Sequence, residues 1–306
     1  MLQLLLPPAA RLPQPLPATL AAAFGRAGID RADNLASALQ RAFPGLPMPW
    51  PVAALTRLAD ADDADIRDHA WLRADPALIQ PDMVGARLMA TGAMLPLTRA
   101  DVDALLPALR PLFGDAGFAL DAPHPQRWYL RMTAATPLPA FPAPESALGE
   151  DPFDHPPQGD AALVRRWRVL ANEAQVVLHN HPHNARRRSA GLPPVNSLWF
   201  HGGGRLPDSA ASTFPTLLTD DPLLHGLAAL AKVAAHPLPD TFSAMSDSAL
   251  VDLRALPAAR LLEDWLLPAL SHRGPQRWSF EDGPGVSLAP SQRLRFWRRP
   301  VSRLPA

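Results

Sequence analysis

A regular alternation of short apolar runs with helical patterns, beginning near residue 195, constrains the fold most strongly. Apolar runs of strand length lie at 195–200, 214–219 and 248–253, and helical patterns follow the last two at 221–235 and 258–272. Parallel strands need a crossover connection, and a helix normally supplies it. The pattern therefore predicts an α/β fold with at least a parallel core.

The chain ahead of this region supplies further elements. We expect strands at 2–7 and 70–79, and two strands around a turn within 117–132. Pro76 is expected to stop the strand at 70–79. Helices are expected at 18–28, 34–43, 51–61, 98–114 and 160–181. The helix at 98–114 has the clearest start, because the Thr98 hydroxyl can cap it and Asp101 follows three residues later. Residues 292–299 are expected to form a closing strand with Phe296 or Trp297 packed inward.

Proline composition suggests where the chain divides. Residues 133–159 hold many prolines and little periodicity, which is typical of a long loop or a linker. We therefore expect 1–60 to form the first strand and helices of the core, 61–160 an α+β subdomain with the proline-rich loop, and 161–306 the completion of the core.

Composition excludes several classes of protein. The chain has 306 residues and no cysteine, so disulfides, cysteine zinc sites and thiol nucleophiles are ruled out. Its 29 basic and 29 acidic residues balance to a net charge of +0, which disfavours a nucleic-acid partner. No apolar run approaches the ~20 residues that cross a bilayer, so we expect a cytoplasmic protein without a membrane partner.

The segment 178–204 concentrates polar side chains of the kind that bind anions. Asn172 and His179 share a helix face with Gln175, and Pro182 turns the chain after His181. A run of arginines then offers planar donors suited to phosphate or carboxylate. The candidate anion ligands are Asn172, His179, His181, Asn184, Arg187 and Asn196, with Gly202 and Gly203 allowing close backbone approach.

Other chemistries fit this segment less well. A zinc site from His179, His181 and His183 lacks a fourth ligand nearby and is interrupted by Pro182. The glycines match neither a dinucleotide fingerprint nor a P-loop. The acidic run from Asp60 to Asp68 has no EF-hand spacing and is interpreted as a solvated loop or helix start. We therefore predict no metal ligands, no cofactor and no identifiable catalytic residue.

The same segment carries a family resemblance. The pattern His-Pro-x-Asn-x-x-Arg-x-x-x-Gly-x-Pro-x-x-Asn begins at His181 and includes Asn184, Arg187 and Asn196, and "SLWFHGGG" follows it. With "WLRADP", "RWYLRM" and "NEAQVVLH" elsewhere, it resembles bacterial RpfE-type regulatory proteins, which are often labelled phosphoglycerate mutases. The His-Pro-x-Asn-x-x-Arg part is also similar to a segment of archaeal-type, cofactor-independent phosphoglycerate mutases.

That second resemblance implies a doubly wound, largely parallel sheet like the alkaline phosphatase core, with an α+β insert or lid. It also implies a serine nucleophile and two metal ions held by Asp and His, which this chain departs from. Asp252 is alone where a late Asp-x-x-x-His cluster is expected, and the first strand lacks an Asp-Gly ligand. Two-metal catalysis needs several converging carboxylates.

Three functions remain open from the sequence. One is a regulatory pseudoenzyme that binds a small phosphorylated or carboxylate metabolite without turnover. A second is an active phosphoglycerate mutase or phosphatase, which would need Mn or Zn. The third is a protein–protein interaction module, which is suggested by the Arg-rich and aromatic segment 293–305.

Overall fold

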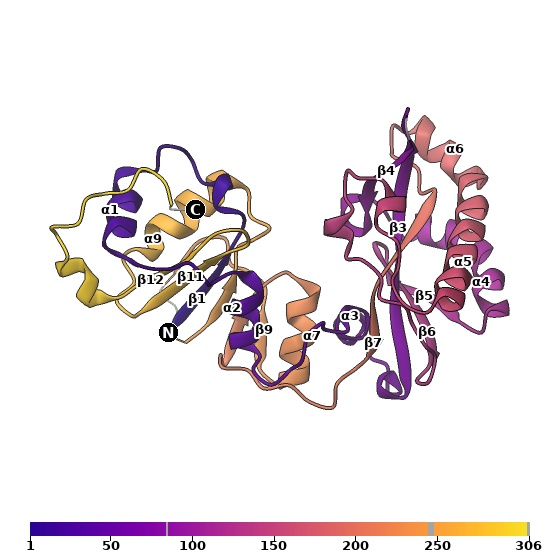
Figure 1. The fold of residues 1–306 in the computed structure, drawn as a ribbon, viewed down its shortest axis with the longest axis horizontal. Helices are drawn as coiled ribbons and strands as arrows, with labels where there is room; N and C mark the ends of the chain where they lie inside the picture. The colour runs from indigo at the N-terminus through magenta and orange to yellow at the C-terminus, as the bar shows by residue number, and fades with distance from the viewer. Residues whose placement is uncertain (84, 244–247, 305–306) are drawn as a thin grey trace. The chain divides into compact units, whose positions relative to one another are not determined.

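The chain folds into two compact units in the computed structural model, which describes residues 1–83, 85–243 and 248–304 (Figure 1). Unit 1 combines Met1–Pro47 with Ser209–Ala306, and unit 2 is the continuous segment Met48–Asp208. Residues 161–208, expected to complete the core, therefore fold with unit 2 instead. The physical reason is that the helix after residue 160 packs its apolar face on the same sheet as the helix after Thr98.

Unit 1 is built on a seven-stranded sheet in the order β2-β12-β11-β1-β10-β8-β9. Five neighbouring strands, from β11 to β9, run parallel, and β12 and β2 add an antiparallel edge. The strands are β1 (Leu2–Leu6), β2 (Gly28–Asp30), β8 (Thr216–Leu218), β9 (Ala234–His236), β10 (Leu250–Asp252), β11 (Gln276–Phe280) and β12 (Gly285–Leu288). The predicted α/β class with a parallel core is confirmed.

Helices cover both faces of this sheet, as in a doubly wound fold. Leu2, Leu4 and Leu6 point to one face, where they pack in a cluster with Phe24 of α1 (Ala18–Arg26) and Trp265. Figure 1 shows α1 and α9 on one side of the strands and α2 on the other. The remaining helices of unit 1 are α2 (Leu35–Ala42), α7 (Pro222–Ala231), α8 (Ala258–Arg260) and α9 (Leu267–Ala269).

The helix predicted at 258–272 is present from α8 to α9, with a wide π turn at Leu261–Leu266 between them. Pro268 has no N–H to donate four residues back. The carbonyl of Asp264 accepts the amide of Phe242 instead, at 2.8 Å. Because of Pro268, the Asp264 carbonyl is free to accept the Phe242 amide, and this bond links the loop at Phe242 to the helix.

Unit 2 is an antiparallel sheet with helices packed on it. Its long central strand pairs with β4 and β6 on one side and with β7 on the other, and β5 pairs with β6. The strands are β3 (His69–Pro81), β4 (Ala86–Thr91), β5 (Ala119–His124), β6 (Arg127–Thr133) and β7 (Ser197–Arg205). The strand did not stop at Pro76, because residues 74–76 fall between the segments paired with β6 and β4, where a missing N–H costs little.

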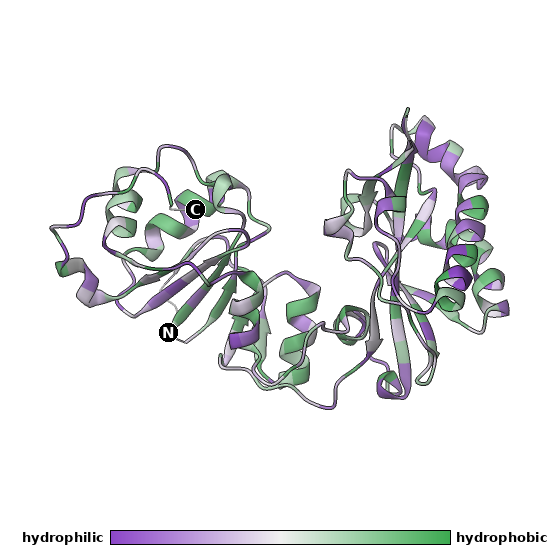
Figure 2. Ribbon diagram, viewed as in Figure 1, coloured by the Kyte–Doolittle hydropathy of each residue, from purple (hydrophilic) through white to green (hydrophobic). Residues whose placement is uncertain are grey.

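The α-helices of the described part of unit 2 are α3 (Val52–Asp60), α4 (Arg99–Asp115), α5 (Ala161–His179) and α6 (Pro182–Ser189). The predicted cap of α4 is confirmed, since the Thr98 side chain and Asp101 form a reciprocal capping box. Trp167 of α5 stacks on Phe118 at 5.2 Å in the core below. In Figure 2 hydrophobic and hydrophilic residues alternate along α4 and α5, as expected for helices with one buried face.

Several segments differ from the sequence expectation. Residues 290–294 form a short 3-10 helix, not a strand, and Phe296 and Trp297 are 79% and 68% exposed. Pro290 starts the 3-10 turn, and the Arg295 and Arg298 side chains donate to the carbonyls of Arg26 and Ala27 at the end of α1. The other 3-10 turns lie at Ala9–Arg11, Ile66–Asp68, Gly92–Met94, Pro144–Ser146 and Pro152–Asp154.

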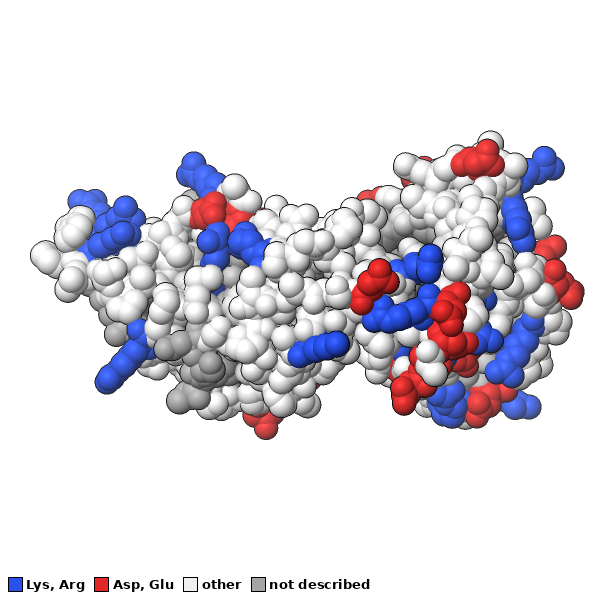
Figure 3. Space-filling model, turned by 90° about the horizontal axis from the view of Figure 1, so that it is seen from below, with Lys and Arg blue, Asp and Glu red and all other residues white. Residues whose placement is uncertain are grey.

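The acidic run also differs from a fully solvated loop. Asp60 accepts hydrogen bonds from Arg127 and from the Tyr129 hydroxyl, and Asp63 pairs with Arg57. Figure 3 shows acidic and basic side chains interspersed on the face of unit 2 that it displays. Among the described residues, no helix is both long and apolar enough to cross a bilayer.

Candidate functional site

The predicted anion-binding segment folds around the junction of α5 and α6. Pro182 occupies the first turn of α6, and His181 is its N-cap, with Nδ1 accepting the amide of His183 at 3.2 Å. Burial lowers the pKa of His181, and the neighbouring His183 lowers it further. The imidazole of His181 is thus neutral at neutral pH, which suits a hydrogen-bond acceptor at a helix start.

Asn184 lies at the centre of this junction and is fully buried. Its amide nitrogen donates to the carbonyls of Leu178 and Val195, both at 2.7 Å, and its oxygen accepts the amide of Val195 at 2.8 Å. The side chain therefore ties the end of α5 to the start of β7. An anion here would have to displace these three bonds.

Arg187 is buried as well, and its partner was not anticipated from the sequence. The guanidinium donates to Asp101 of α4 at 2.7 Å and to the Pro193 carbonyl at 2.9 Å, and His183 Nε2 lies 2.7 Å from the same carboxylate. Burial alone would raise the pKa of Asp101, but hydrogen bonds from His183, the Thr98 amide and Arg187 hold it well below its usual range. Asp101 is thus a charged anchor for α6.

Asn196 extends the strand pairing of β7 with its side chain. Its oxygen accepts the amide of Ile79 at 2.9 Å, and its nitrogen donates to the Ile79 carbonyl at 2.7 Å. Gly202 and Gly203 also meet protein and not ligand, because an added Cβ would lie 2.7 Å from Val52 and 2.8 Å from Leu138, respectively. Both glycines thus allow another group to approach the backbone closely, as predicted, but these groups are side chains of the protein itself.

Asn172 and His179 lie on the exposed face of α5. Asn172 lines a groove of about 470 Å³ in unit 2, which the other seven predicted ligands do not line. The structure therefore brings Asn184, Arg187 and His181 together as one structural junction. It leaves Asn172 beside a separate cavity.

The carboxyl edge of the parallel sheet is the second candidate region, because ligands of open α/β sheets bind at this edge. Asp252 ends β10, and Asp221 follows β8 and caps α7. Arg254 joins them: Nε and Nη2 lie 2.7 and 2.8 Å from the Asp252 carboxylate, and Nη2 lies 2.6 Å from Asp221. The buried Thr219 hydroxyl donates to Asp252 at 3.3 Å.

Charge at this edge is balanced internally. Burial alone would lower the pKa of Arg254, but its bonds to Asp252 and Asp221 raise it above its ordinary value, so the guanidinium stays charged. Glu281, which follows β11, is an acid whose pKa is raised above its ordinary value. Burial raises the pKa of Glu281, Arg254 lowers it, and Asp252 and Asp282 raise it again. The sequence shows that Asp252 and Arg254 are two residues apart. The contact of Arg254 with Asp221, however, depends on the order of the strands in the sheet.

The residues present do not fit a pair of metal ions. In the described part of the chain no group of three or more His, Asp or Glu side chains is arranged to hold a metal ion. At the carboxyl edge the position between Asp252 and Asp221 is filled by the Arg254 guanidinium. A cation would have to displace a charged group that already satisfies both carboxylates.

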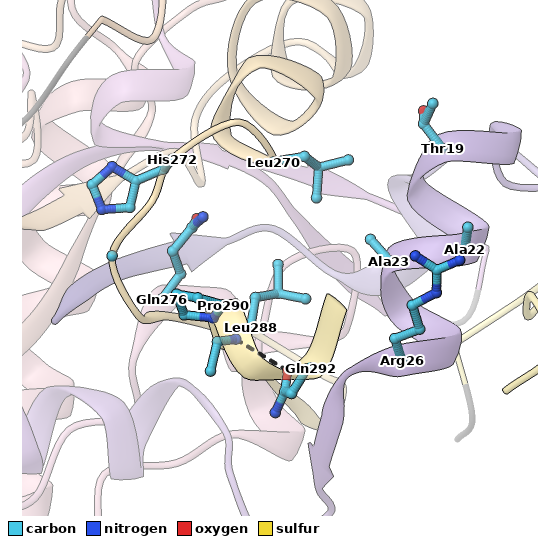
Figure 4. Close-up of a pocket in the computed structure, with 12 residues that line it drawn as sticks. Thr19, Ala22, Ala23, Arg26, Leu270, His272, Gln276, Leu288, Pro290 and Gln292 are labelled. Atoms are coloured by element: carbon cyan, nitrogen blue, oxygen red, sulfur yellow. Dashed lines mark hydrogen bonds between the residues drawn. The ribbon is translucent and has the colours of Figure 1, made fainter. Parts of the chain in front are cut away.

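Unit 1 also contains a cavity of about 370 Å³ between α1 and the segment 288–292 (Figure 4). Arg26 lies on the α1 side, facing Gln276 and Gln292 across the cavity. Gln276 donates to the Ala269 carbonyl and accepts from Trp278 Nε1, and Gln292 Oε1 accepts the Ala289 amide. Both amides therefore serve the fold, and we assign this cavity no ligand.

Short segments of the chain are distantly similar to 2,3-bisphosphoglycerate-independent phosphoglycerate mutases. A segment of 68 residues, 22% of this chain, is 38% identical to the probable 2,3-bisphosphoglycerate-independent phosphoglycerate mutase of Geobacter sulfurreducens. A segment of 64 residues, 21% of the chain, is 38% identical to the corresponding enzyme of Methanothrix thermoacetophila. Each match covers 16% of the relative's length. The similarity is thus distant and partial.

Two solved structures align over most of the chain. The cofactor-independent phosphoglycerate mutase of Thermoplasma acidophilum has a TM-score of 0.40 and 16% identity over 94% of this chain and 89% of its own. The PH0037 protein of Pyrococcus horikoshii has a TM-score of 0.43 and 10% identity over 94% and 87%. No family model matches the chain.

Proposed function

We propose that this chain is a regulatory protein on a phosphoglycerate mutase-like scaffold that has lost metal-dependent turnover. The observation that carries the proposal is Arg254, which bridges Asp252 and Asp221 at the edge where ligands of parallel sheets bind. The partial similarity to phosphoglycerate mutases supports the origin of the scaffold. The finer assignment to the RpfE-type regulatory proteins belongs to the same proposal.

Physical chemistry supports loss of turnover from these contacts. Phosphoryl transfer through two metal ions needs carboxylates that are open to the ions and ions that contact both attacking and leaving oxygens. Asp252 and Asp221 instead share one guanidinium with close, charge-assisted hydrogen bonds. Removing Arg254 would leave two carboxylates side by side without a counter-ion, which is the arrangement that attracts a divalent cation.

The test is a metal titration combined with a mutase assay on the full-length chain. We expect no interconversion of 2- and 3-phosphoglycerate by the wild type with Mn²⁺ or Zn²⁺, and weak Mn²⁺ binding by calorimetry. Arg254→Ala should bind Mn²⁺ more tightly, by about tenfold or more. Arg11→Ala is the matched control, because the Arg11 side chain donates to the backbone carbonyl of Arg254 and, among the described residues, to neither carboxylate.

The outcome that overturns this proposal is an active enzyme. Metal-dependent turnover by the wild type at ordinary enzyme rates, on the order of 1 per second or more, would establish the alternative of a working phosphoglycerate mutase or phosphatase. Equal Mn²⁺ affinity of the wild type and Arg254→Ala would remove Arg254 as the reason for inactivity.

A second candidate function, an interaction module, is favoured by the end of the chain. Leu294, Phe296 and Trp297 are 72%, 79% and 68% exposed, and the two rings pack against each other at 5.4 Å. Exposed aromatic residues beside arginines are typical of interface anchors. Deleting residues 291–306 would be a poor test, because Val301 and Leu304 pack on the core of unit 1.

A double substitution separates the surface role from the structural one. Phe296→Ala with Trp297→Ala should leave the melting temperature unchanged and abolish capture of a specific partner from cells. Val169→Ala, another exposed apolar position, is the control and should retain the partner. Equal capture by wild type and the double variant would exclude this surface as an interface.

A further inference from the structure

The groove of unit 2 that Asn172 lines includes polar side chains of α5 that bond to no described residue. One wall is the face of α5 that carries Trp167, Ala171 and Asn172, and another is β7 from Ser197 to Phe200. The proline-rich loop provides the remaining wall, with Phe141, Pro142, Pro152, Phe153, Pro156 and Pro157. The volume of about 470 Å³ lies in the range of small-molecule sites, about 300–1,000 Å³.

Apolar surface dominates the groove and is partly exposed. Trp167 and Phe200 are buried beneath it, and Phe141 packs edge-on against Trp167 at 5.3 Å. Phe153 is 83% exposed at the groove, where its ring gains little from the rest of the fold. Four prolines restrict the backbone of the loop. The loop therefore loses little conformational entropy when a ligand binds in the groove. This lining favours a ligand with an apolar body.

A polar stripe runs along the α5 wall. Arg168, Asn172 and Gln175 are spaced by four and three residues, so they follow one face of the helix. Within the described chain none of the three side chains has a hydrogen bond, an ion pair or a ring contact. The stripe therefore offers one guanidinium and two amides with their full capacity for a ligand.

The charge of the lining is one-sided. Arg168 carries a positive charge, and no Asp or Glu is among the described residues that line the groove. Just outside the lining, the Asp151 carboxylate accepts the backbone amides of Phe153 and Ala86, and Glu150, which is 63% exposed, lies 2.6 Å from His155 Nε2. A carboxylate is the ligand group that matches an unpaired arginine with flanking amide donors.

We propose that this groove binds a small carboxylic acid with an apolar body. The carboxylate pairs with Arg168 and receives hydrogen bonds from Asn172 and Gln175, while the body lies between Trp167, Phe153 and the prolines. Binding here does not depend on the absence of turnover, because Arg254 belongs to unit 1 and the groove to unit 2.

Calorimetry with a matched series of probes tests this site on the full-length chain. Octanoate and 4-phenylbutanoate supply an alkyl and an aryl carboxylate, and octan-1-ol and octylamine keep the body but replace the charge. At least one carboxylate should bind in a saturable, one-to-one manner, about tenfold or more tighter than the alcohol and the amine. The comparison of the two carboxylates decides between an alkyl and an aryl body.

Substitutions locate the binding. Arg168→Gln should weaken carboxylate binding by about tenfold or more, whereas Arg165→Gln, an exposed arginine of the same helix outside the groove, should change it less than about twofold. Arg168→Glu should reverse the preference, so that octylamine binds more tightly than octanoate. Phe153→Ala should weaken every probe by about threefold to tenfold through lost apolar contact.

The proposal fails if neither carboxylate binds, or if octan-1-ol binds as tightly as octanoate. It also fails if Arg168→Gln and Arg165→Gln have the same effect. Because Arg168 and Phe153 are exposed, unchanged melting temperatures for their variants will separate lost binding from lost folding.

Discussion

Two consecutive helices of unit 2 use their polar side chains in opposite ways. On α6 and beside it, Asn184 and Arg187 are buried and bonded to their own chain. On α5, Arg168 and Asn172 line a groove, and their side chains form no hydrogen bond or ion pair with any described residue. The more conspicuous motif in the sequence is therefore structural, and the less conspicuous stripe keeps its capacity for a ligand.

The largest effect should come from Arg187→Ala. Its side chain is 1% exposed and pairs with Asp101, so truncation removes the guanidinium from a buried carboxylate that keeps, among the described residues, only His183 and Thr98 as donors, and it takes the Arg187 donor from the Pro193 carbonyl. We expect the free energy of unfolding to fall by about 3–5 kcal/mol. Urea denaturation measures it, and Arg188→Ala, exposed on the same helix, should change it by less than about 0.5 kcal/mol.

Asn184→Ala should follow, with a loss of about 2–4 kcal/mol, because the buried Val195 amide and carbonyl lose the Asn184 side chain and the Leu178 carbonyl loses one of its donors. Asn172→Ala is the matched control on the other helix and should lie within about 0.5 kcal/mol of wild type. A loss at Asn172 as large as that at Asn184 would contradict the difference between the two helices.

The pH dependence of stability should show a smaller effect through Asp101. Its pKa is lower in the folded chain than in the unfolded one, so the carboxylate stabilises the fold above the unfolded value of about 3.9. That contribution is lost as the pH falls below about 4.5 toward the folded pKa. Asp101→Asn should flatten the decline of unfolding free energy between about pH 5 and pH 2.5, although it lowers stability at neutral pH. Parallel curves for both proteins would show that Asp101 is not the anchor.

The smallest effect on stability is expected at Arg168. Arg168→Gln should alter the free energy of unfolding by less than about 0.5 kcal/mol, because this exposed side chain forms no hydrogen bond or ion pair with the part of the chain that the structure describes. The same variant should lose carboxylate binding, so function and stability separate at one position. A clear destabilisation would mean that the stripe is also structural.

The sequence predicted features that depend on neighbours along the chain. The capping of α4 by Thr98 and Asp101, the break at Pro182 and the parallel core of unit 1 all follow from local pattern. The contacts of Arg187 with Asp101 and of Arg254 with Asp221 join residues 86 and 33 positions apart. Such contacts depend on strand order and helix packing, which periodicity does not specify.

The candidate site shows the same division. Asn172 was identified from helical spacing, but the loop that turns its face into a groove has no periodicity. Arg168 was not selected because an exposed arginine on a helix is ordinary. The closing segment was misassigned because the alternating pattern of 292–299 does not show that Pro290 starts a turn there.

Arg254 makes the charge balance of Asp252 and Asp221 independent of ions in the solvent. A guanidinium keeps its proton throughout the physiological pH range and, unlike a bound ion, cannot be chelated or exchanged. The acidic pair Asp252 and Asp221 thus has a permanent neutralising group encoded in the polypeptide itself. We therefore expect the carboxyl edge of the unit 1 sheet to keep the same conformation whether divalent cations are scarce or abundant in the cell.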